Sequence, residues 1–159
     1  MKQEFIDALV GICGQDYVYY TKEDVAGYLY DETEEYVRPK ACEDCLVVRP
    51  GTYEEVSKIL QWANETKTPI IPRGGGTGAC GAAIPTIPSV IMSMERFKEI
   101  VEVDETNMMI TCQTGVTLAK LNDYLNEHVH ALYFPCHPGD EGGRRWAACA
   151  LRTPAASGP

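Results

Sequence analysis

Basic residues are scarce in this chain: 14 lysines and arginines stand against 23 aspartates and glutamates, a formal net charge of −9. Because nucleic-acid phosphates demand basic patches, this balance argues against a DNA- or RNA-binding protein. The acids cluster at residues 23–35, which we interpret as solvated surface. No stretch approaches the ~18 apolar residues of a membrane span, and the first residues carry acids where a signal peptide would be apolar. We therefore expect a cytoplasmic protein with no transmembrane segment and no nucleic-acid partner.

Cysteine is present, but in no pattern that builds a disulfide framework or a complete metal site. An odd count of seven, without a secretion signal, indicates reduced thiols. Cys42 and Cys45 have the C-x-x-C spacing of half a zinc site, and no second C-x-x-C completes it. The pair could converge with other potential ligands, which are His128, His130, Cys136 and His137. We expect no bound metal, and a redox role for Cys136 is a further hypothesis.

The order of apolar segments predicts strands and helices in alternation. Strands are expected at residues 46–49, 70–71, 90–94, 100–103 and 108–113. One helix begins after Thr52, an N-cap residue followed by acids in the first turn. Its apolar face is expected to hold Val56, Ile59, Leu60 and Ala63. A second helix begins after Thr117, with Leu118, Leu121 and Leu125 as its apolar stripe. The class is therefore α/β, or α+β if the middle strands form a meander.

A glycine-rich loop, PRGGGTGACG at residues 72–81, is the most informative feature of the chain. Five glycines in nine positions allow positive φ at little cost and let the backbone approach a ligand closely. Such a loop turns several N–H groups toward one point and forms a concave nest for an anion such as phosphate. Arg73 adds a positive charge beside it and Thr77 adds a hydroxyl donor. A diphosphate group is the expected guest.

Two common nucleotide-binding motifs do not fit this loop. Gly76, Gly78 and Gly81 match G-x-G-x-x-G, but a Rossmann unit requires a helix to begin at the last glycine. Here Pro85 and Pro88 follow and forbid a regular helix. No Gly-Lys-Ser/Thr ending is present, so a P-loop is excluded as well. A purely structural glycine turn is the remaining alternative, although a turn needs fewer glycines.

Three passages carry a resemblance to one flavoprotein superfamily. They are RPGTYEEVSKILQWANETKTPIIPRGGGTGACGAAIP, VIMSMERFKEIVEVDETNMMITCQTGVTLAKLNDYL and FPCHPGDEG. In this order they resemble the N-terminal part of the PCMH-type FAD-binding domain of the vanillyl-alcohol oxidase/p-cresol methylhydroxylase superfamily. The likeness is greatest to the FAD-linked D-lactate and glycolate dehydrogenases. It covers residues 25–142.

The resemblance implies an FAD-dependent oxidoreductase that converts a D-2-hydroxy acid, lactate or glycolate, to the 2-oxo acid and passes electrons to a partner protein. It also implies which residues touch FAD: Arg73, Gly74, Gly75, Gly76, Thr77, Gly78, Gly81, Pro138 and Gly139. No residue of the chain matches a catalytic base of the family. The family's substrate-binding cap is expected to lie outside this chain, so we expect the chain alone to be inactive.

The last residues depart from the family pattern. After Gly142 the chain reads GRRWAACALRTPAASGP, whereas the family continues toward T-N-A-G-G. Codons read one base out of phase from Gly143 onward permit that family segment, and Trp146 before Ala147 forces a glycine in it. We therefore infer a frameshift near codons 142–143, the alternative being a genuinely divergent C-terminus.

The expected organisation follows from these boundaries. Residues 1–40 form an N-terminal helical segment, 41–142 a partial FAD-binding domain, and 143–159 a disordered tail outside the family. Two other functions stay open. One is a nucleotide- or phosphate-binding module without redox chemistry, and the other is a non-catalytic subunit of a flavoprotein complex.

Overall fold

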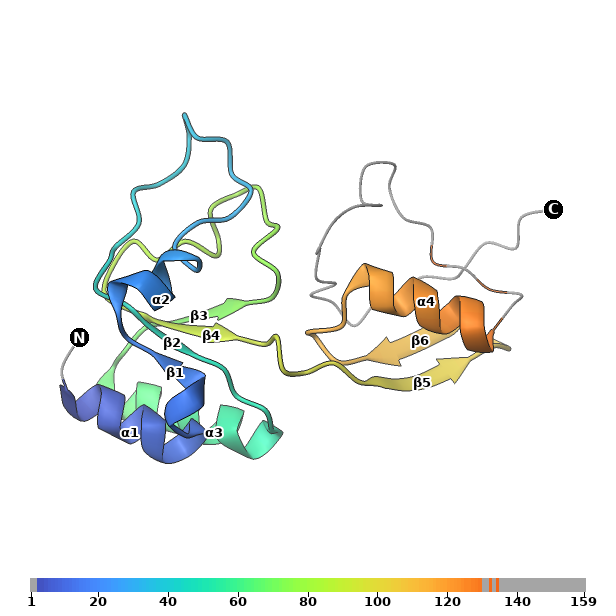
Figure 1. The fold of residues 1–159 in the computed structure, drawn as a ribbon, viewed down its shortest axis with the longest axis horizontal. Helices are drawn as coiled ribbons and strands as arrows, with labels where there is room; N and C mark the ends of the chain where they lie inside the picture. The colour runs from blue at the N-terminus through green and yellow to red at the C-terminus, as the bar shows by residue number, and fades with distance from the viewer. Residues whose placement is uncertain (1–2, 130–131, 133, 135–159) are drawn as a thin grey trace. The chain divides into compact units, whose positions relative to one another are not determined.

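The computed structural model describes residues 3–129, 132 and 134. They divide into two compact units, the first ending at Arg96 and the second beginning at Phe97 (Figure 1). The tail expected from residue 143 onward lies outside the described residues. Each unit is described by itself below.

The first unit is built on a four-stranded mixed sheet in the order β1-β2-β4-β3. The strands are β1 (Val18–Tyr19), β2 (Leu46–Val48), β3 (Ile70–Arg73) and β4 (Val90–Ser93). Both β2 and β3 run parallel to the central β4, with Leu46 and Ile70 opposite Val90. β1 is an antiparallel edge strand on β2. Because β2 and β4 are buried along their whole length, they consist of apolar residues apart from Ser93.

Helices cover both faces of this sheet (Figure 1). They are α1 (Gln3–Cys13), α2 (Lys22–Ala26) and α3 (Tyr53–Thr66), with a short 3-10 turn, η1, at Gln15–Tyr17. Thr52 is the N-cap of α3, and its side chain accepts a hydrogen bond from the N–H of Glu55. The helix ends at Lys67, which adopts the left-handed conformation with φ 56°.

Successive side chains of a strand point to opposite faces of the sheet, so the same strands contribute to a hydrophobic core on each face. On one face, Leu9 of α1 and Ile59 of α3 pack with Val48 and Val90. On the other face, Val25 of α2 packs with Val47 and Ile91. The same strands therefore anchor both helical layers, and their carboxyl ends are held in fixed positions.

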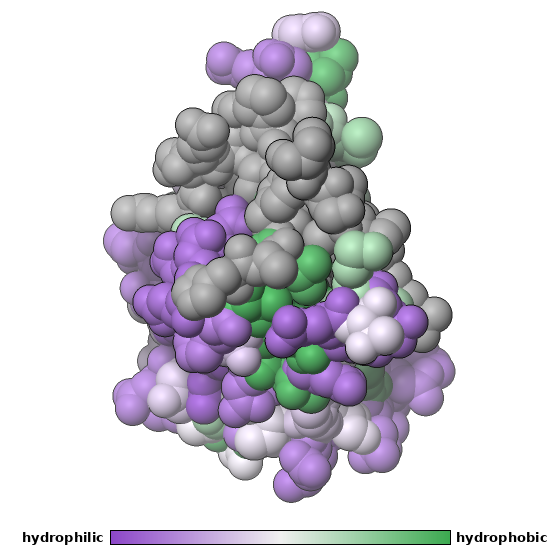
Figure 2. All heavy atoms as spheres, turned by 90° about the vertical axis from the view of Figure 1, so that its right-hand side faces the viewer, coloured by the Kyte–Doolittle hydropathy of each residue, from purple (hydrophilic) through white to green (hydrophobic). Residues whose placement is uncertain are grey.

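The second unit is a β-hairpin with one helix. β5 (Ile100–Asp104) pairs antiparallel with β6 (Met109–Cys112), and α4 (Leu118–His128) follows. A small core of four buried residues holds it together: Val116, Leu121, Leu125 and Val129. On the face shown in Figure 2, hydrophobic side chains gather near the centre, with hydrophilic ones to either side of them.

The class predicted from the sequence, α/β with α+β character, is confirmed, and each predicted strand and helix has a counterpart. The prediction for Leu60 is wrong: this residue is 46% exposed, while Ile59 and Ala63 face the core. The segment expected to be helical up to residue 40 also contributes β1 to the sheet. The first compact unit ends at Arg96. The domain boundaries expected at residues 40 and 142 stay a prediction.

Neighbouring residues of α3 test this packing. We expect Ile59→Ala to lower the free energy of unfolding by about 2–5 kcal/mol, because the fully buried side chain leaves a cavity. Leu60→Ala, the matched control on the exposed side, should cost about 0.5 kcal/mol. Urea unfolding followed by circular dichroism measures both. Equal losses for the two variants would contradict the assigned helix face.

Candidate cofactor-binding site

The glycine loop leaves the sheet at the carboxyl end of β3. Arg73 is the last residue of that strand and lies opposite Ser93 of β4, and its carbonyl accepts from the N–H of Met94 at 2.9 Å. In open sheets with parallel strands, ligands bind outside the carboxyl ends of the strands. The loop therefore begins where this architecture favours a ligand site.

The backbone of the loop requires glycine at two positions. Gly76 has φ +71° and Gly81 has φ +74°, conformations that other residues rarely adopt. A Cβ on Gly76 would collide with the guanidinium of Arg73, and one on Gly81 would lie 3.2 Å from the ring of Pro39. The tight turn at Gly76 is thus built around the arginine side chain beneath it.

The N–H groups of residues 74–78 donate to no other residue in the part of the chain that the structure describes. Gly74, Gly75, Gly76 and Thr77 are half-buried, and Gly78 is exposed. Backbone donors in a folded protein are nearly always paired with protein, water or ligand. A run of donors left over on a half-buried glycine loop is the feature expected of an anion cradle, so the residues present fit the diphosphate of a dinucleotide cofactor.

Arg73 is placed differently from the free charge expected beside the anion. Its side chain is 7% exposed and donates to the carbonyl of Tyr30 at 2.8 Å and, more weakly, to that of Tyr28 at 3.4 Å. Burial lowers the pKa of this guanidinium, and neighbouring groups that include Asp31 oppose the shift. The charge therefore lies behind the loop, tied to main-chain oxygens.

Two residues near the loop were missed by the sequence reasoning. Asp31 and Thr33 are each 3% exposed, although both lie in the acidic run interpreted as solvated surface. That interpretation is wrong for Asp31, while Glu32 and Glu34 beside it are exposed. The signal in the sequence was the alternation D-E-T-E, in which every second residue is buried.

A second polar cluster lies at the carboxyl ends of β2 and β4. Arg49 forms an ion pair with Glu95 and donates a hydrogen bond to the hydroxyl of Tyr19. Tyr28 donates its hydroxyl proton to Glu95 at 3.0 Å. Burial, together with the Glu95 charge, raises the pKa of Tyr28. Arg49 and Tyr28 thus both engage Glu95, and Tyr28 stays protonated, so the cluster supports the strand ends.

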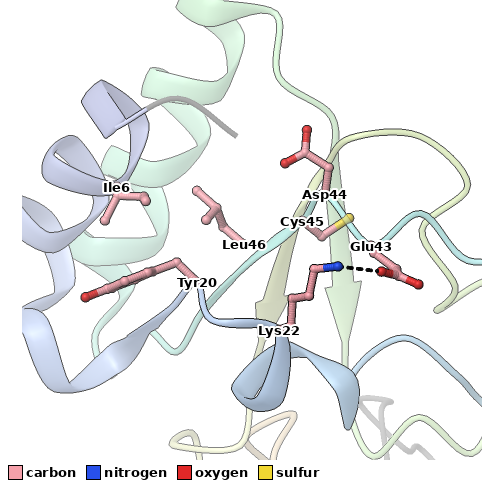
Figure 3. Close-up of a pocket in the computed structure, with 7 residues that line it drawn as sticks. All are labelled: Ile6, Tyr20, Lys22, Glu43, Asp44, Cys45 and Leu46. Atoms are coloured by element: carbon pink, nitrogen blue, oxygen red, sulfur yellow. Dashed lines mark hydrogen bonds and ion pairs between the residues drawn. The ribbon is translucent and has the colours of Figure 1, made fainter.

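A cavity of about 310 Å³ lies elsewhere in the first unit (Figure 3). It opens beside Cys45 and Leu46 at the amino end of β2, and Ile6 and Tyr20 line another side. The ion pair at its rim, Lys22 to Glu43 at 3.3 Å, is strongly exposed. Exposed pairs of this kind contribute little, and the amino ends of parallel strands are not the favoured ligand side.

The remaining sequence expectations concern thiols and metals. Burial raises the pKa values of the Cys13 and Cys45 thiols to about 11, and Cys80 in the glycine loop is exposed. Within residues 3–129, 132 and 134, no three His, Cys, Asp or Glu side chains gather as a metal-ligating group. His130, Cys136 and His137 lie outside the described residues, as do Pro138 and Gly139.

Comparison with known proteins shows the family to which the chain belongs. The family described as the FAD binding domain matches residues 45–142, which includes the whole glycine loop. The chain belongs to this family. FAD is thus the indicated cofactor of this domain.

Curated relatives of the chain are hydroxy-acid enzymes. A D-lactate dehydrogenase from Archaeoglobus fulgidus is 46% identical over 114 residues, which cover 72% of this chain and 25% of the relative. The glycolate oxidase subunit GlcD of Bacillus subtilis is 37% identical over 89 residues, covering 56% of this chain and 18% of that protein. The chain therefore spans a quarter or less of the length of these relatives.

Solved structures confirm the fold. p-Cresol methylhydroxylase with substrate bound superposes with a TM-score of 0.73 at 21% identity, covering 86% of this chain and 27% of that one. No helix in the described part of this chain combines the length and apolarity that a membrane crossing needs. The cytoplasmic location expected from the sequence stays a prediction.

Two neighbouring glycines test the geometry of the loop. We expect Gly76→Ala to cost about 1–2 kcal/mol of folding free energy for the left-handed backbone, and more from the collision with Arg73. Gly78→Ala is the matched control, because its φ is not positive and its Cβ would lie 3.9 Å from the nearest side-chain atom. Thermal and urea unfolding measure both. Equal stability of the two variants would contradict the described turn.

Thiol labelling tests the burial of the cysteines. With a pKa of about 11, roughly one Cys13 or Cys45 thiol in a thousand is ionised at pH 8. We expect iodoacetamide to modify Cys80 at least about tenfold faster than either, and labelling of the buried pair to accelerate as the pH rises toward 11. Peptide mass spectrometry resolves the sites. Faster labelling of Cys45 than of Cys80 would overturn the assignment.

Proposed function

We propose that this chain binds the diphosphate of FAD through its glycine loop, as part of an oxidoreductase that acts on a D-2-hydroxy acid, either lactate or glycolate. The observation that supports it most is the run of unused N–H donors at residues 74–78, inside the segment that matches the FAD binding domain family. The run includes the left-handed Gly76, and its donors have no partner among the described residues.

The proposed contacts are those expected from the sequence, with changes of role for Gly81 and Arg73. Backbone N–H groups of Gly74, Gly75, Gly76, Gly78 and Gly81 line the loop, with Thr77 as a side-chain donor. Gly81 already donates its N–H to Thr33 at 2.6 Å, so it shapes the loop more than it binds the anion.

Arg73 acts in the proposal from behind the loop, through its charge and its bonds to the carbonyls of Tyr28 and Tyr30. A buried, always-protonated guanidinium still contributes a favourable field to an anion held above it. Pro138 and Gly139, outside the described residues, complete the proposed cofactor contacts.

The proposed reaction is the two-electron oxidation of a hydroxy acid. The α-carbon loses a hydride equivalent and the hydroxyl loses a proton, which leaves the 2-oxo acid. Bound FAD would supply the electron acceptor, and an electron-transfer protein partner would remove the electrons from it. This chain's described residues bind and orient the diphosphate, and none of them is proposed as the catalytic base.

Affinity of the chain by itself should be weak. The chain spans about a quarter of its D-lactate dehydrogenase relative, so much of the cofactor's contact surface belongs to other segments. The remaining contacts must offset the whole association entropy. We therefore expect the purified chain to retain no FAD and to show no turnover, while the loop binds a diphosphate at about millimolar concentration.

Residue-resolved NMR tests the diphosphate site at such affinities. We expect ADP and pyrophosphate to shift the amide resonances of residues 74–78 in a ¹⁵N-labelled chain, with saturation at millimolar ligand. Adenosine, which carries no phosphate, is the matched control and should leave them unmoved. Absence of shifts with about 10 mM pyrophosphate and ADP, or equal shifts with adenosine, would overturn the diphosphate assignment.

The oxidoreductase part needs a separate experiment. The chain by itself is expected to hold no FAD, so the experiment uses the whole oxidoreductase of which we propose this chain is a part, isolated from its native cells through a tag at Met1. That protein should contain FAD and reduce a dye acceptor with D-lactate or glycolate, and much more slowly with L-lactate. A preparation that binds diphosphate but contains no flavin would favour the phosphate-binding module. A flavin carried by a co-purified second protein would favour the non-catalytic subunit.

A further inference from the structure

A second segment of the chain is fastened along the glycine loop. The brace segment, residues 27–33, lies more than 40 positions earlier in the sequence. Glu32 donates its N–H to the carbonyl of Gly78 at 2.9 Å, and Thr33 accepts from the N–H of Gly81 through its hydroxyl at 2.6 Å. Arg73 reaches back to the carbonyl of Tyr30 at 2.8 Å. These three hydrogen bonds engage the beginning, middle and end of the loop.

Asp31 lies at the centre of the brace segment and is 3% exposed. Its Oδ1 accepts from the N–H of Thr33 at 2.9 Å, which forms a tight Asx-type turn. Its Oδ2 accepts no hydrogen bond from the described residues and lies 3.9 Å from where a Cβ of Gly78 would be. The carboxylate is therefore directly behind the loop.

Burial by itself would raise the pKa of Asp31. The pKa is nevertheless lowered, because the hydroxyl and N–H of Thr33, the backbone of Ala83 and the charge of Arg73 favour the ionised form. Asp31 and Arg73 thus lie behind one loop as opposite buried charges. Burial of a charge is costly unless another group compensates it, so each of these residues supports the position of the other.

The negative charge of Asp31 excludes a role in attracting the anion. A carboxylate beside a bound diphosphate repels it, so attraction of the anion cannot explain this position. What the carboxylate does provide is an acceptor that fixes Thr33, whose hydroxyl then holds the N–H of Gly81. Holding the loop in one shape before the ligand arrives reduces the entropy lost on binding.

We propose that Asp31 and Thr33 are positioning residues, which hold the glycine loop in its diphosphate-binding shape. The proposal rests on the proposed function for the identity of the ligand. The bracing itself is a property of the ligand-free chain, and it can therefore be measured without any cofactor.

The Asp31→Asn variant distinguishes a positioning role of Asp31 from a direct effect of its charge on the bound anion. Loss of a negative charge near an anion site strengthens binding if only the field matters. We expect the reverse, an ADP affinity about tenfold weaker by NMR titration, because a neutral amide accepts from Thr33 more weakly than the carboxylate does and no longer compensates the charge of Arg73. Glu34→Gln, the matched control, removes the same charge from an exposed neighbour and should leave the affinity unchanged. Unchanged or tighter binding by Asp31→Asn would overturn the proposal.

Thr33→Val provides the test that needs no ligand. It removes the hydroxyl and keeps the branched shape, so the Gly81 N–H loses its acceptor. We expect the Gly81 amide to exchange with solvent about tenfold faster, while the core amides of Val47 and Ile91 keep their rates. Thr33→Ser retains the hydroxyl and should restore slow exchange.

The outcomes keep the two proposals apart. If the wild-type chain fails to bind ADP, the proposed function fails, and the Gly81 exchange rates still decide the bracing. If Thr33→Val leaves Gly81 exchange unchanged, or accelerates Val47, Ile91 and Gly81 alike, the positioning role is overturned. Should Asp31→Asn fail to fold, the Thr33 pair decides the question through the same exchange rates.

Discussion

The buried guanidinium of Arg73 is the group around which the glycine loop is arranged. It ends β3, fills the space beneath the left-handed Gly76 and bonds to carbonyls of the brace segment. A buried cation needs such partners, because its desolvation is otherwise costly. The Arg73 side chain therefore supports the shape of the loop. The N–H groups of residues 74–78 form no hydrogen bonds with the described residues.

The sheet supplies the rigid base for that arrangement. β4 lies between β2 and β3, and residues on its two faces belong to two different hydrophobic clusters. Parallel strands packed in this way place Arg49, Arg73 and Glu95 at or just beyond their carboxyl ends. The charged groups there are engaged in ion pairs and in hydrogen bonds to tyrosine hydroxyls and main-chain carbonyls. The loop backbone, by contrast, keeps the N–H groups of residues 74–78 unused by the described residues.

The match to the FAD binding domain family includes the whole glycine loop. The match begins at residue 45, one residue before β2, whereas the brace segment lies earlier in the chain. The chain spans a quarter or less of the D-lactate dehydrogenase and glycolate oxidase relatives. A diphosphate cradle can be complete within such a length, because it is made mostly of consecutive backbone groups.

The sequence by itself determined the local features: the glycine loop, the caps at Thr52 and Thr117, and the position of each main strand and helix. These depend on residues close together in the chain, where periodicity and capping preferences are informative. Leu60 was misjudged because a helix exposes part of any wide apolar stripe. The long-range contacts became visible only in the folded structure: Arg73 is buried and donates to main-chain carbonyls of Tyr28 and Tyr30, and Asp31 is buried beside it. The partners of Arg73 lie over 40 residues away along the chain, and no local pattern encodes a hydrogen bond across that distance.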